Sequence, residues 1–308
     1  MKAPMPPAQH SPHWHILGAG AIGSLWSAYW QQQHFATTVI SRRHSGPRQL
    51  ELIAPQSRFA FSQQQLTAVD LEQEIQQLLI TTKAHQCLAA FNSIQHRLSD
   101  DAVIVVLQNG MAVNTLPTRA QQRLYAATTT DGAHFKNDKT LVHAGQGETY
   151  LGPINAYAKQ LPADALMQQL PSALHLHYCL DIEQRLWRKL AINCAINALG
   201  VKYQCRNGEL ISNAAIRQEL IDLCQEISMV AAALELGPWF DNLYQEVAKV
   251  AQLTHNNINS TLQDINQGKT TEIIALNGYL CDIAKSLQLA TPLNQALLEL
   301  VLANSPAQ

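Results

Sequence analysis

A short glycine-rich turn around residue 20 restricts the possible folds of this chain more than any other feature. Residues 14–17 predict a β-strand, and the spacing of apolar residues after the turn predicts a helix that reaches Gln33. Between them the chain reads Gly18-Ala19-Gly20-Ala21-Ile22-Gly23, which is the G-x-G-x-x-G pattern in its strand–turn–helix context. The first glycine permits the tight turn, the second lets a pyrophosphate approach the backbone, and the third permits close helix–strand packing. An ordinary glycine-rich turn is the alternative, but the context favours a dinucleotide-binding α/β domain.

Residues 37–40 predict the second strand, and the residues that follow it bear on the choice of cofactor. Sites for NAD usually carry an acidic residue there, which hydrogen-bonds the ribose 2′-hydroxyl. This chain instead reads Ser41-Arg42-Arg43, and an arginine can pair with the 2′-phosphate of NADP. We therefore expect Arg42 to select NADP(H). A pair of surface arginines without such a role is the alternative.

Polar side chains follow two later strands, at the point where each strand is expected to end. Residues 78–82 lead into Lys83, and residues 102–107 lead into Gln108 and Asn109. Ligands of open α/β sheets bind at the carboxyl ends of the strands, so Lys83 and Asn109 are candidate ligand-binding residues. Either of them could also be a turn residue, since Asn-Gly is a common turn pair. The same part of the chain predicts a helix at 85–98, strands at 125–130 and 174–178, and a hairpin of 141–144 and 148–151 around Gly145-Gln146-Gly147.

After residue 180 the β-branched runs give way to helical spacing. In the first helical stretch Lys189, Asn193 and Asn197 are four residues apart and therefore share one face. Polar groups that face a buried surface need partners, so this row predicts a ligand site. A polar seam between helices or a solvated face is the alternative. Helices are expected at 182–199, 214–236, 243–256, 258–267, 271–287 and 292–303.

The expected fold class is therefore α/β, with two domains. Residues 1–180 form an N-terminal Rossmann-type, doubly wound domain that begins with a disordered lead-in at 1–12, and residues 181–308 form a C-terminal all-helical domain. The net charge is −2 and no long basic run is present, which argues against binding to nucleic acid or to an acidic membrane surface. Six cysteines without a C-x-x-C pair, and the lack of an apolar run of transmembrane length, indicate a cytoplasmic protein; no metal site is expected.

Six motifs occur in a fixed order from about His13 to the C-terminus. They are the glycine turn, Thr82-Lys83-Ala84, Gln108-Asn109-Gly110-Met111, Leu186-Trp187-Arg188-Lys189-Leu190-Ala191-Ile192-Asn193, Asn207-Gly208-Glu209-Leu210, and Ser260-Thr261-Leu262-Gln263-Asp264-Ile265 followed by Thr271-Glu272-Ile273. In this order they resemble the motifs of the 2-dehydropantoate 2-reductases, also called ketopantoate reductases. That family reduces ketopantoate to pantoate with NADPH, on the route to pantothenate and coenzyme A.

The resemblance implies a role for each matching position. Lys189 matches the family's catalytic lysine, which would stabilise the alkoxide formed by hydride transfer to the C2 ketone and donate a proton to it. Glu272 would orient this lysine or bind the nicotinamide ribose, and Asn257 would lie near the substrate. The matching substrate-binding positions are Asn109, Asn193, Asn197, Asn207 and Ser260, and the matching cofactor-binding positions are Gly18, Ala19, Gly20, Ala21, Ile22, Gly23, Arg42, Lys83, Asn109, Ala133 and Glu272.

Two departures from the family's pattern bear on substrate preference. Asp131 stands where a neutral residue or a histidine is expected, and Lys202-Tyr203 adds a charge near the end of the lysine helix. We therefore predict NADPH-dependent ketopantoate reduction by a monomer or homodimer. One alternative is another NADP-dependent 2-oxo acid reductase, because a fold alone does not fix the substrate. The other is a non-catalytic NADP-binding sensor, which would have no need of Lys189 with its asparagines.

Overall fold

The computed structural model describes residues 12–306 and separates the chain into two units. The first unit contains the described residues up to Thr82, together with 86–108 and 116–182. The second contains 83–85, 109–115 and the chain from residue 183 onward. The expected lead-in lies outside the described residues except for Pro12. Among residues 12–306, none of the helices combines the length and the apolar character needed to cross a membrane.

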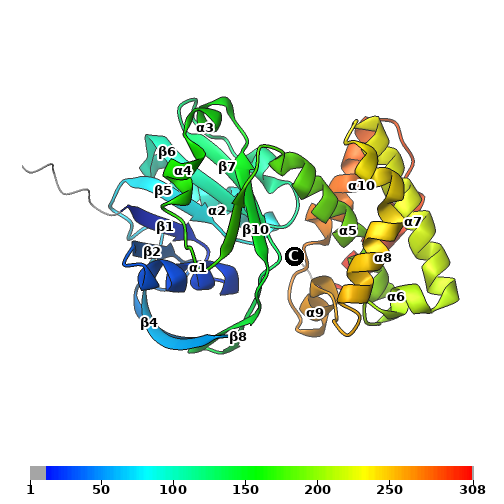
Figure 1. The fold of residues 1–308 in the computed structure, drawn as a ribbon, viewed down its shortest axis with the longest axis horizontal. Helices are drawn as coiled ribbons and strands as arrows, with labels where there is room; N and C mark the ends of the chain where they lie inside the picture. The colour runs from blue at the N-terminus through cyan, green and yellow to red at the C-terminus, as the bar shows by residue number, and fades with distance from the viewer. Residues whose placement is uncertain (1–11, 307–308) are drawn as a thin grey trace, which may run out of the picture. The chain divides into compact units, whose positions relative to one another are not determined.

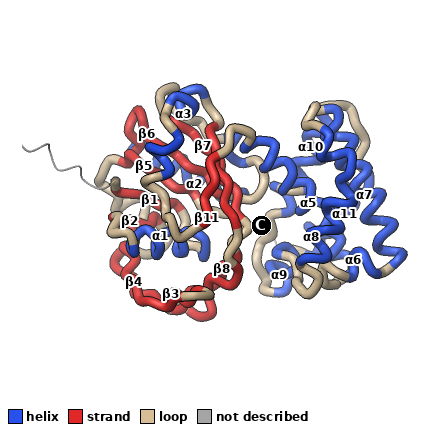
Figure 2. Tube along the Cα trace, viewed as in Figure 1, coloured by secondary structure: helices blue, strands red, loops and turns tan. Residues whose placement is uncertain are grey.

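One sheet of 11 strands forms the first unit, in the order β11-β10-β7-β6-β5-β1-β2-β4-β3-β9-β8. The strands from β7 to β4 in this order run parallel to their neighbours. With the helices that alternate with them in the chain (Figures 1 and 2), they confirm the expected α/β class with a Rossmann-type first domain. The strands are β1 (His13–Leu17), β2 (Ala36–Ile40), β3 (Gly46–Ala54), β4 (Ser57–Leu66), β5 (Ile75–Ile80), β6 (Leu98–Leu107), β7 (Arg123–Thr129), β8 (Gly132–Asn137), β9 (Thr140–Gly145), β10 (Glu148–Pro153) and β11 (His175–Tyr178). The helices of this part of the chain are α1 (Ala21–Gln32), α2 (Ala84–Ile94), α3 (Ala156–Gln160) and α4 (Ala163–Met167).

The hairpin expected around residues 145–147 is wrong in its turn and in its pairing. β9 pairs antiparallel with β8, and β10 pairs antiparallel with β7, so the chain forms one long hairpin with a bend in each arm. The tight turn lies at Asp138-Lys139, where the Asn137 side chain accepts a hydrogen bond from the Lys139 N–H at 2.9 Å. Gly147 lies at the bend. A Cβ atom at this position would collide with Thr130 of the other arm, so the close approach of the two arms requires glycine here. The glycines therefore let two strands cross closely, where the sequence pattern suggested a turn.

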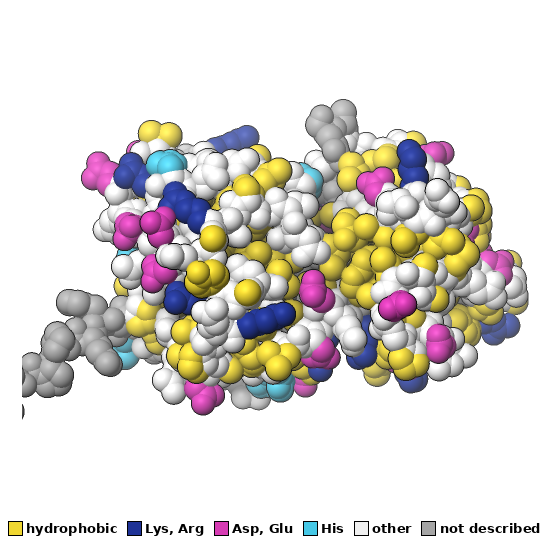
Figure 3. All heavy atoms as spheres, turned by 90° about the horizontal axis from the view of Figure 1, so that it is seen from above, with side chains coloured by type: hydrophobic (Ala, Val, Ile, Leu, Met, Phe, Trp, Pro, Cys, Tyr) yellow, Lys and Arg dark blue, Asp and Glu magenta, His cyan; other side chains and the backbone are white. Residues whose placement is uncertain are grey.

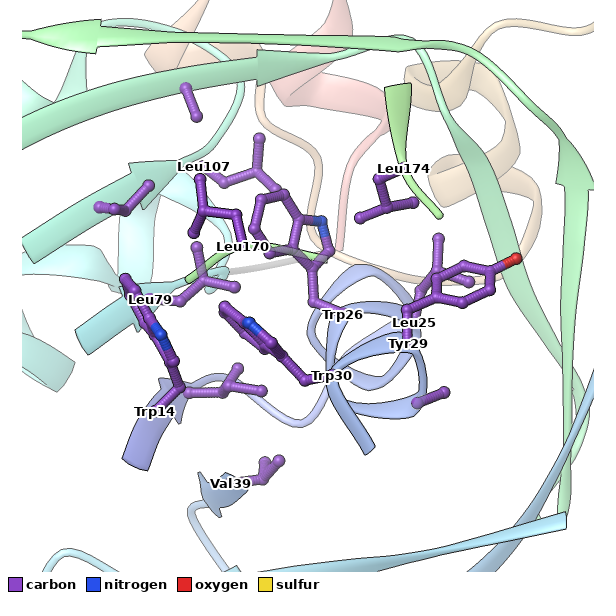
Figure 4. Packing of buried hydrophobic residues seen from close by; sticks show 14 of the residues in the cluster. Trp14, Leu25, Trp26, Tyr29, Trp30, Val39, Leu79, Leu107, Leu170 and Leu174 are labelled. Atoms are coloured by element: carbon purple, nitrogen blue, oxygen red, sulfur yellow. The ribbon is translucent and has the colours of Figure 1, made fainter. Parts of the chain in front are cut away.

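Helix α1 lies at the centre of the hydrophobic core of the first unit. Trp30 stacks on Trp14 of β1 with ring centroids 4.9 Å apart, and Trp26 meets Trp30 edge to face at 5.3 Å (Figure 4). All three indoles are at most 1% exposed. The helix also contacts β8 and β9, and the Tyr29 hydroxyl bonds Nδ1 of His143 in β9 at 2.9 Å. The long hairpin therefore wraps around α1, which is packed on more than one side.

The second unit is built from helices, as expected for the C-terminal domain (Figure 2). They are α5 (Ile182–Tyr203), α6 (Glu209–Ser212), α7 (Ala214–Ala233), α8 (Leu243–Leu253), α9 (Ser260–Asn266), α10 (Asn277–Ser286) and α11 (Pro292–Asn304). The helix expected over 271–287 is broken into a 3₁₀ turn at Ile273–Ala275 and α10. The backbone leaves the helical conformation at Leu276, which has φ −105° and ψ −95°. The buried Asn277 amide at the start of α10 donates to the Cys194 carbonyl at 3.2 Å and to Asn294 at 3.1 Å.

Apolar side chains also reach the surface of the second unit. Met229, Leu253 and Ile274 are 39%, 84% and 44% exposed. Figure 3 shows that hydrophobic side chains gather on the face of this unit that it draws.

Candidate functional site

The glycine turn of the first unit offers uncapped backbone N–H groups. Gly18 has φ +122°, and a Cβ atom there would lie 3.0 Å from the backbone of Thr81, so this position requires glycine. Gly20 precedes α1, and no side chain caps the first turn of the helix. Gly20 has open space around its Cα atom, whereas a Cβ atom on Gly23 would collide with the Gly18 carbonyl. The turn therefore combines the tight packing and the open N-terminus that a phosphate group needs.

A basic pocket of about 700 Å³ adjoins this turn in the first unit. Arg42 and Arg43 are exposed, while Arg48 is fixed: its guanidinium donates to the Asp138 carbonyl at 2.7 Å and lies 4.7 Å from the Phe135 ring centre. The lining residues are Ala19, Ser41, Arg42, Arg43, His44, Ser45, Gly46, Pro47, Arg48, Gln65 and Asp138. The sequence drew attention to Arg42 and missed Arg48, because β3 was not predicted.

The row of polar residues in the second unit lies on α5. Asn197 is 5% exposed, and Lys189 and Asn193 are partly buried. Burial lowers the pKa of Lys189 to about 8, and the Glu272 carboxylate opposes this by raising the pKa. An ammonium group with such a pKa is still mostly protonated at pH 7 and gives up its proton more readily than an ordinary lysine.

Glu272 contacts both of the short segments, 83–85 and 109–115, that belong to the second unit. Its Oε2 accepts a hydrogen bond from Nδ2 of Asn109 at 2.9 Å, and its Oε1 accepts one from the Ala84 N–H at 3.2 Å. Lys83 donates to Asp264 at 2.7 Å and to the Thr270 carbonyl at 3.0 Å. The structure therefore brings Lys83, Asn109 and Glu272 into the same unit as Lys189. Sequence reasoning missed Asp264, which lies within a motif that it quoted.

The other residues that are predicted to bind the substrate or to lie near it are in or beside the loop before α9. Asn207 is 7% exposed; its Nδ2 donates to Thr254 at 2.9 Å, and its Oδ1 is buried without a hydrogen-bond partner. The Asn207 N–H donates to the carbonyl of Asn257 at 3.0 Å, which holds the two segments together. Ser260 is exposed and is the first residue of α9. Ala133, expected to contact the cofactor, lies half-buried in β8 of the first unit.

Asp131 is the centre of a buried hydrogen-bond network at the bend of the long hairpin. Its side chain is 2% exposed, and Oδ1 accepts from the Gly147 N–H and lies 2.9 Å from Nε2 of His143. Burial raises the pKa of Asp131, but hydrogen bonds from His143, Gly147 and Thr129 outweigh this and hold the pKa below its ordinary value. In the first unit Asp131 therefore binds the two arms of the hairpin to each other.

Comparisons with known proteins agree on one family. Residues 14–156 match the family model described as ketopantoate reductase PanE/ApbA, and residues 181–305 match the model of its C-terminal part. The chain is 31% identical over 285 residues to the 2-dehydropantoate 2-reductase of Vibrio cholerae, covering 92% of this chain and 94% of the relative. A crystal structure of a probable 2-dehydropantoate 2-reductase from Bacillus subtilis matches with a TM-score of 0.81 at 25% identity, over 96% of this chain and all of the other. The fold is also shared with D-mandelate dehydrogenase, solved with NADH and anilino(oxo)acetate, with a TM-score of 0.84 at 21% identity over 95% of this chain and 98% of the other.

Proposed function

The chain belongs to the ketopantoate reductase family, and we propose that it reduces 2-dehydropantoate to pantoate with NADPH, as a step toward pantothenate and coenzyme A. The observation that carries the proposal is the cluster of the second unit. There a partly buried lysine with a pKa of about 8 is influenced by the same carboxylate that Asn109 and Ala84 hold in place. A non-catalytic sensor of NADP would need neither a lysine tuned in this way nor its row of asparagines.

The first unit has the features of an NADP site. The uncapped turn at Gly20 would bind the pyrophosphate through backbone N–H groups. Arg42, Arg43 and Arg48 line the adjoining pocket, whose positive charge suits a 2′-phosphate better than a ribose hydroxyl. When bound, the cofactor supplies the hydride for the substrate ketone.

Lys189 is the proposed proton donor. As the C2 ketone of the substrate becomes an alkoxide, the ammonium group stabilises the negative charge and transfers a proton to that oxygen. Glu272 keeps the lysine protonated in its partly buried position, since the charge of the carboxylate raises the lysine pKa. We assign this positioning role to Glu272; a hydrogen bond to the cofactor ribose remains an alternative use of the same carboxylate.

The polar side chains around Lys189 would bind the substrate. Asn193 and Asn197 lie on the same face of α5 as the lysine. With Asn109, Asn207 and Ser260 they offer neutral donors and acceptors for the carboxylate and the 4-hydroxyl of ketopantoate. The turn residues 18–23, Ala133 and Lys83 are proposed to contact the cofactor. Lys83 Nζ forms an ion pair with Oδ2 of Asp264 at 2.7 Å.

A reductase of another 2-oxo acid is the second candidate. It is favoured by the fold shared with D-mandelate dehydrogenase, a protein with a different named substrate. Substrate choice would then depend on the asparagines and on Ser260.

Oxidation of NADPH with and without ketopantoate tests the proposal. We expect turnover only with substrate, and a higher kcat/KM for ketopantoate than for pyruvate, 2-oxoisovalerate or benzoylformate. NADH in place of NADPH is the cofactor control. Binding of NADPH without reduction of any of these acids would support the sensor, and a preference for another acid would support the second candidate.

A further inference from the structure

A contact between α5 and the start of α9 does not belong to the site residues named so far. A Cβ atom on Gly200 of α5 would collide with Nδ2 of Asn259 and would lie 3.4 Å from its Cγ. The Asn259 amide therefore rests directly on the backbone of α5. Gly200 follows Asn197 by three residues, so the contact lies about one helical turn beyond the last asparagine of the polar row.

Asn259 also fixes the beginning of α9. It is the N-cap residue, and its Oδ1 accepts a hydrogen bond from the Leu262 N–H at 3.0 Å. The side chain is thus held at one end by α9 and at the other by the surface of Gly200. The next residue is Ser260, which the proposed function places in the substrate site.

The Nδ2 atom of Asn259 is buried and has no hydrogen-bond partner. A serine would cap a helix equally well without burying an unpaired N–H₂ group. Capping alone therefore does not explain an asparagine here. A serine lacks the amide group that fills the space over Gly200 and sets the distance between α9 and α5.

We propose that Asn259 is a positioning residue for substrate binding: its amide, seated on the bare Cα of Gly200, fixes Ser260 relative to the polar row of α5. This inference rests on the proposed function, because it concerns the binding of the same 2-oxo acid. Only glycine at position 200 leaves room for the amide, so the two residues act as a pair. The pair affects how well substrate is bound, while proton transfer from Lys189 proceeds as before.

The test compares Gly200→Ala, Asn259→Ser and the double variant with the parental enzyme. Gly200→Ala adds a methyl group that displaces the amide, and Asn259→Ser keeps a capping oxygen but removes the amide. We expect each single change to raise KM for ketopantoate by roughly tenfold, the order expected when a displaced Ser260 loses one hydrogen bond to the substrate. kcat and the KM for NADPH should change by less than about twofold, since no atom of the cofactor or acid site is altered. In the double variant serine leaves room for the new methyl group, so KM should return toward the parental value.

Gly278→Ala is the matched control. It makes the same change in a buried helical glycine, but the nearest atom to the new methyl group is the Cγ2 of Ile274 at 3.5 Å, an ordinary contact. Melting temperatures and NADPH titrations establish that each variant is folded, and Asn259→Ser decides the matter if Gly200→Ala does not fold. Folded single variants with an unchanged KM, or a double variant whose KM stays raised like that of Gly200→Ala, would overturn the role of Asn259. A parental protein that reduces no 2-oxo acid would instead overturn the proposed function, and the positioning role with it.

Discussion

Replacing Arg42 with alanine should weaken the binding of NADPH and leave that of NADH nearly unchanged. Arg42 lines the pocket of about 700 Å³ beside the glycine turn. A hydrogen bond between charged groups contributes about 1.5–3 kcal/mol. Since about 1.4 kcal/mol corresponds to a factor of ten, the dissociation constant for NADPH should rise by roughly 10- to 100-fold. Because Arg42 is exposed, salt should reduce the difference.

Arg48→Ala should give a loss at the upper end of this range. Its guanidinium is already held by the Asp138 carbonyl at 2.7 Å, so less side-chain freedom is lost when a phosphate binds. Fluorescence titration with NADPH and with NADH measures both effects. Arg58→Ala is the control, because it removes the same charge from the same β3–β4 hairpin, where Arg58 pairs with Glu51 and does not line the pocket. Equal losses for both cofactors, or an equal loss in Arg58→Ala, would refute the assignment of the 2′-phosphate to this pocket.

Three further changes test other parts of the account. Glu272→Gln removes the charge that raises the pKa of Lys189, so the fall of kcat/KM at high pH should begin at a lower pH than in the parental enzyme; a pH profile that does not move would remove Glu272 from this role. Asp131→Ala should lower the free energy of unfolding by roughly 1–3 kcal/mol for each buried hydrogen-bond partner that it leaves unpaired. Since the folded pKa of Asp131 is depressed, its stabilisation is present above the unfolded pKa of about 3.9 and is lost as pH falls through the folded value, so urea titrations of the variant should show less acid dependence. Gly23→Ala should destabilise the protein because its methyl group meets the Gly18 carbonyl, whereas Gly20→Ala has open space and should melt near the parental temperature; similar melting of the two variants would contradict the packing at this turn.

Features that depend on neighbours in sequence were predictable. The strand, turn and helix around Gly18–Gly23 follow from local pattern, and so do the parallel strands that lead to Lys83 and Asn109. The common face of Lys189, Asn193 and Asn197 follows from the helical repeat, because α5 is one unbroken helix. The roles of these residues in binding and catalysis remain predictions.

The β3–β4 hairpin could not be found from apolar alternation alone. Gln63 and Gln65 of β4 are 0% and 2% exposed, although their side chains are polar. They are satisfied by each other, with 2.7 Å between Nε2 of Gln65 and Oε1 of Gln63, and by Ser24 of α1. A search for alternating apolar residues assigns every glutamine to an exposed position. Such a search therefore misses this hairpin and, with it, Arg48.

Other differences come from contacts between distant residues. Hydrogen bonds from Asn277 to the distant residues Cys194 and Asn294 anchor the start of α10, which follows the non-helical Leu276, and no local spacing reveals these contacts. Glu272 meets Asn109 across 163 residues of sequence, so only the fold brings this part of the site together. The sequence around Gly147 suggested a turn. Glycine is instead required there by close contact with Thr130, which lies in the other arm of the hairpin and 17 positions earlier in the sequence.

Steady-state reduction of ketopantoate by the parental enzyme and by Lys189→Ala, measured across pH, tests the central claim most directly. If Lys189 is the acid, the variant should bind NADPH normally but lose about 10²–10⁴-fold in kcat, the usual contribution of a positioned acid. The parental rate should fall as pH rises through the lysine pKa of about 8, and the variant should lack this fall. A folded Lys189→Ala protein that reduces ketopantoate at the parental rate, with the same pH profile, would contradict the claim.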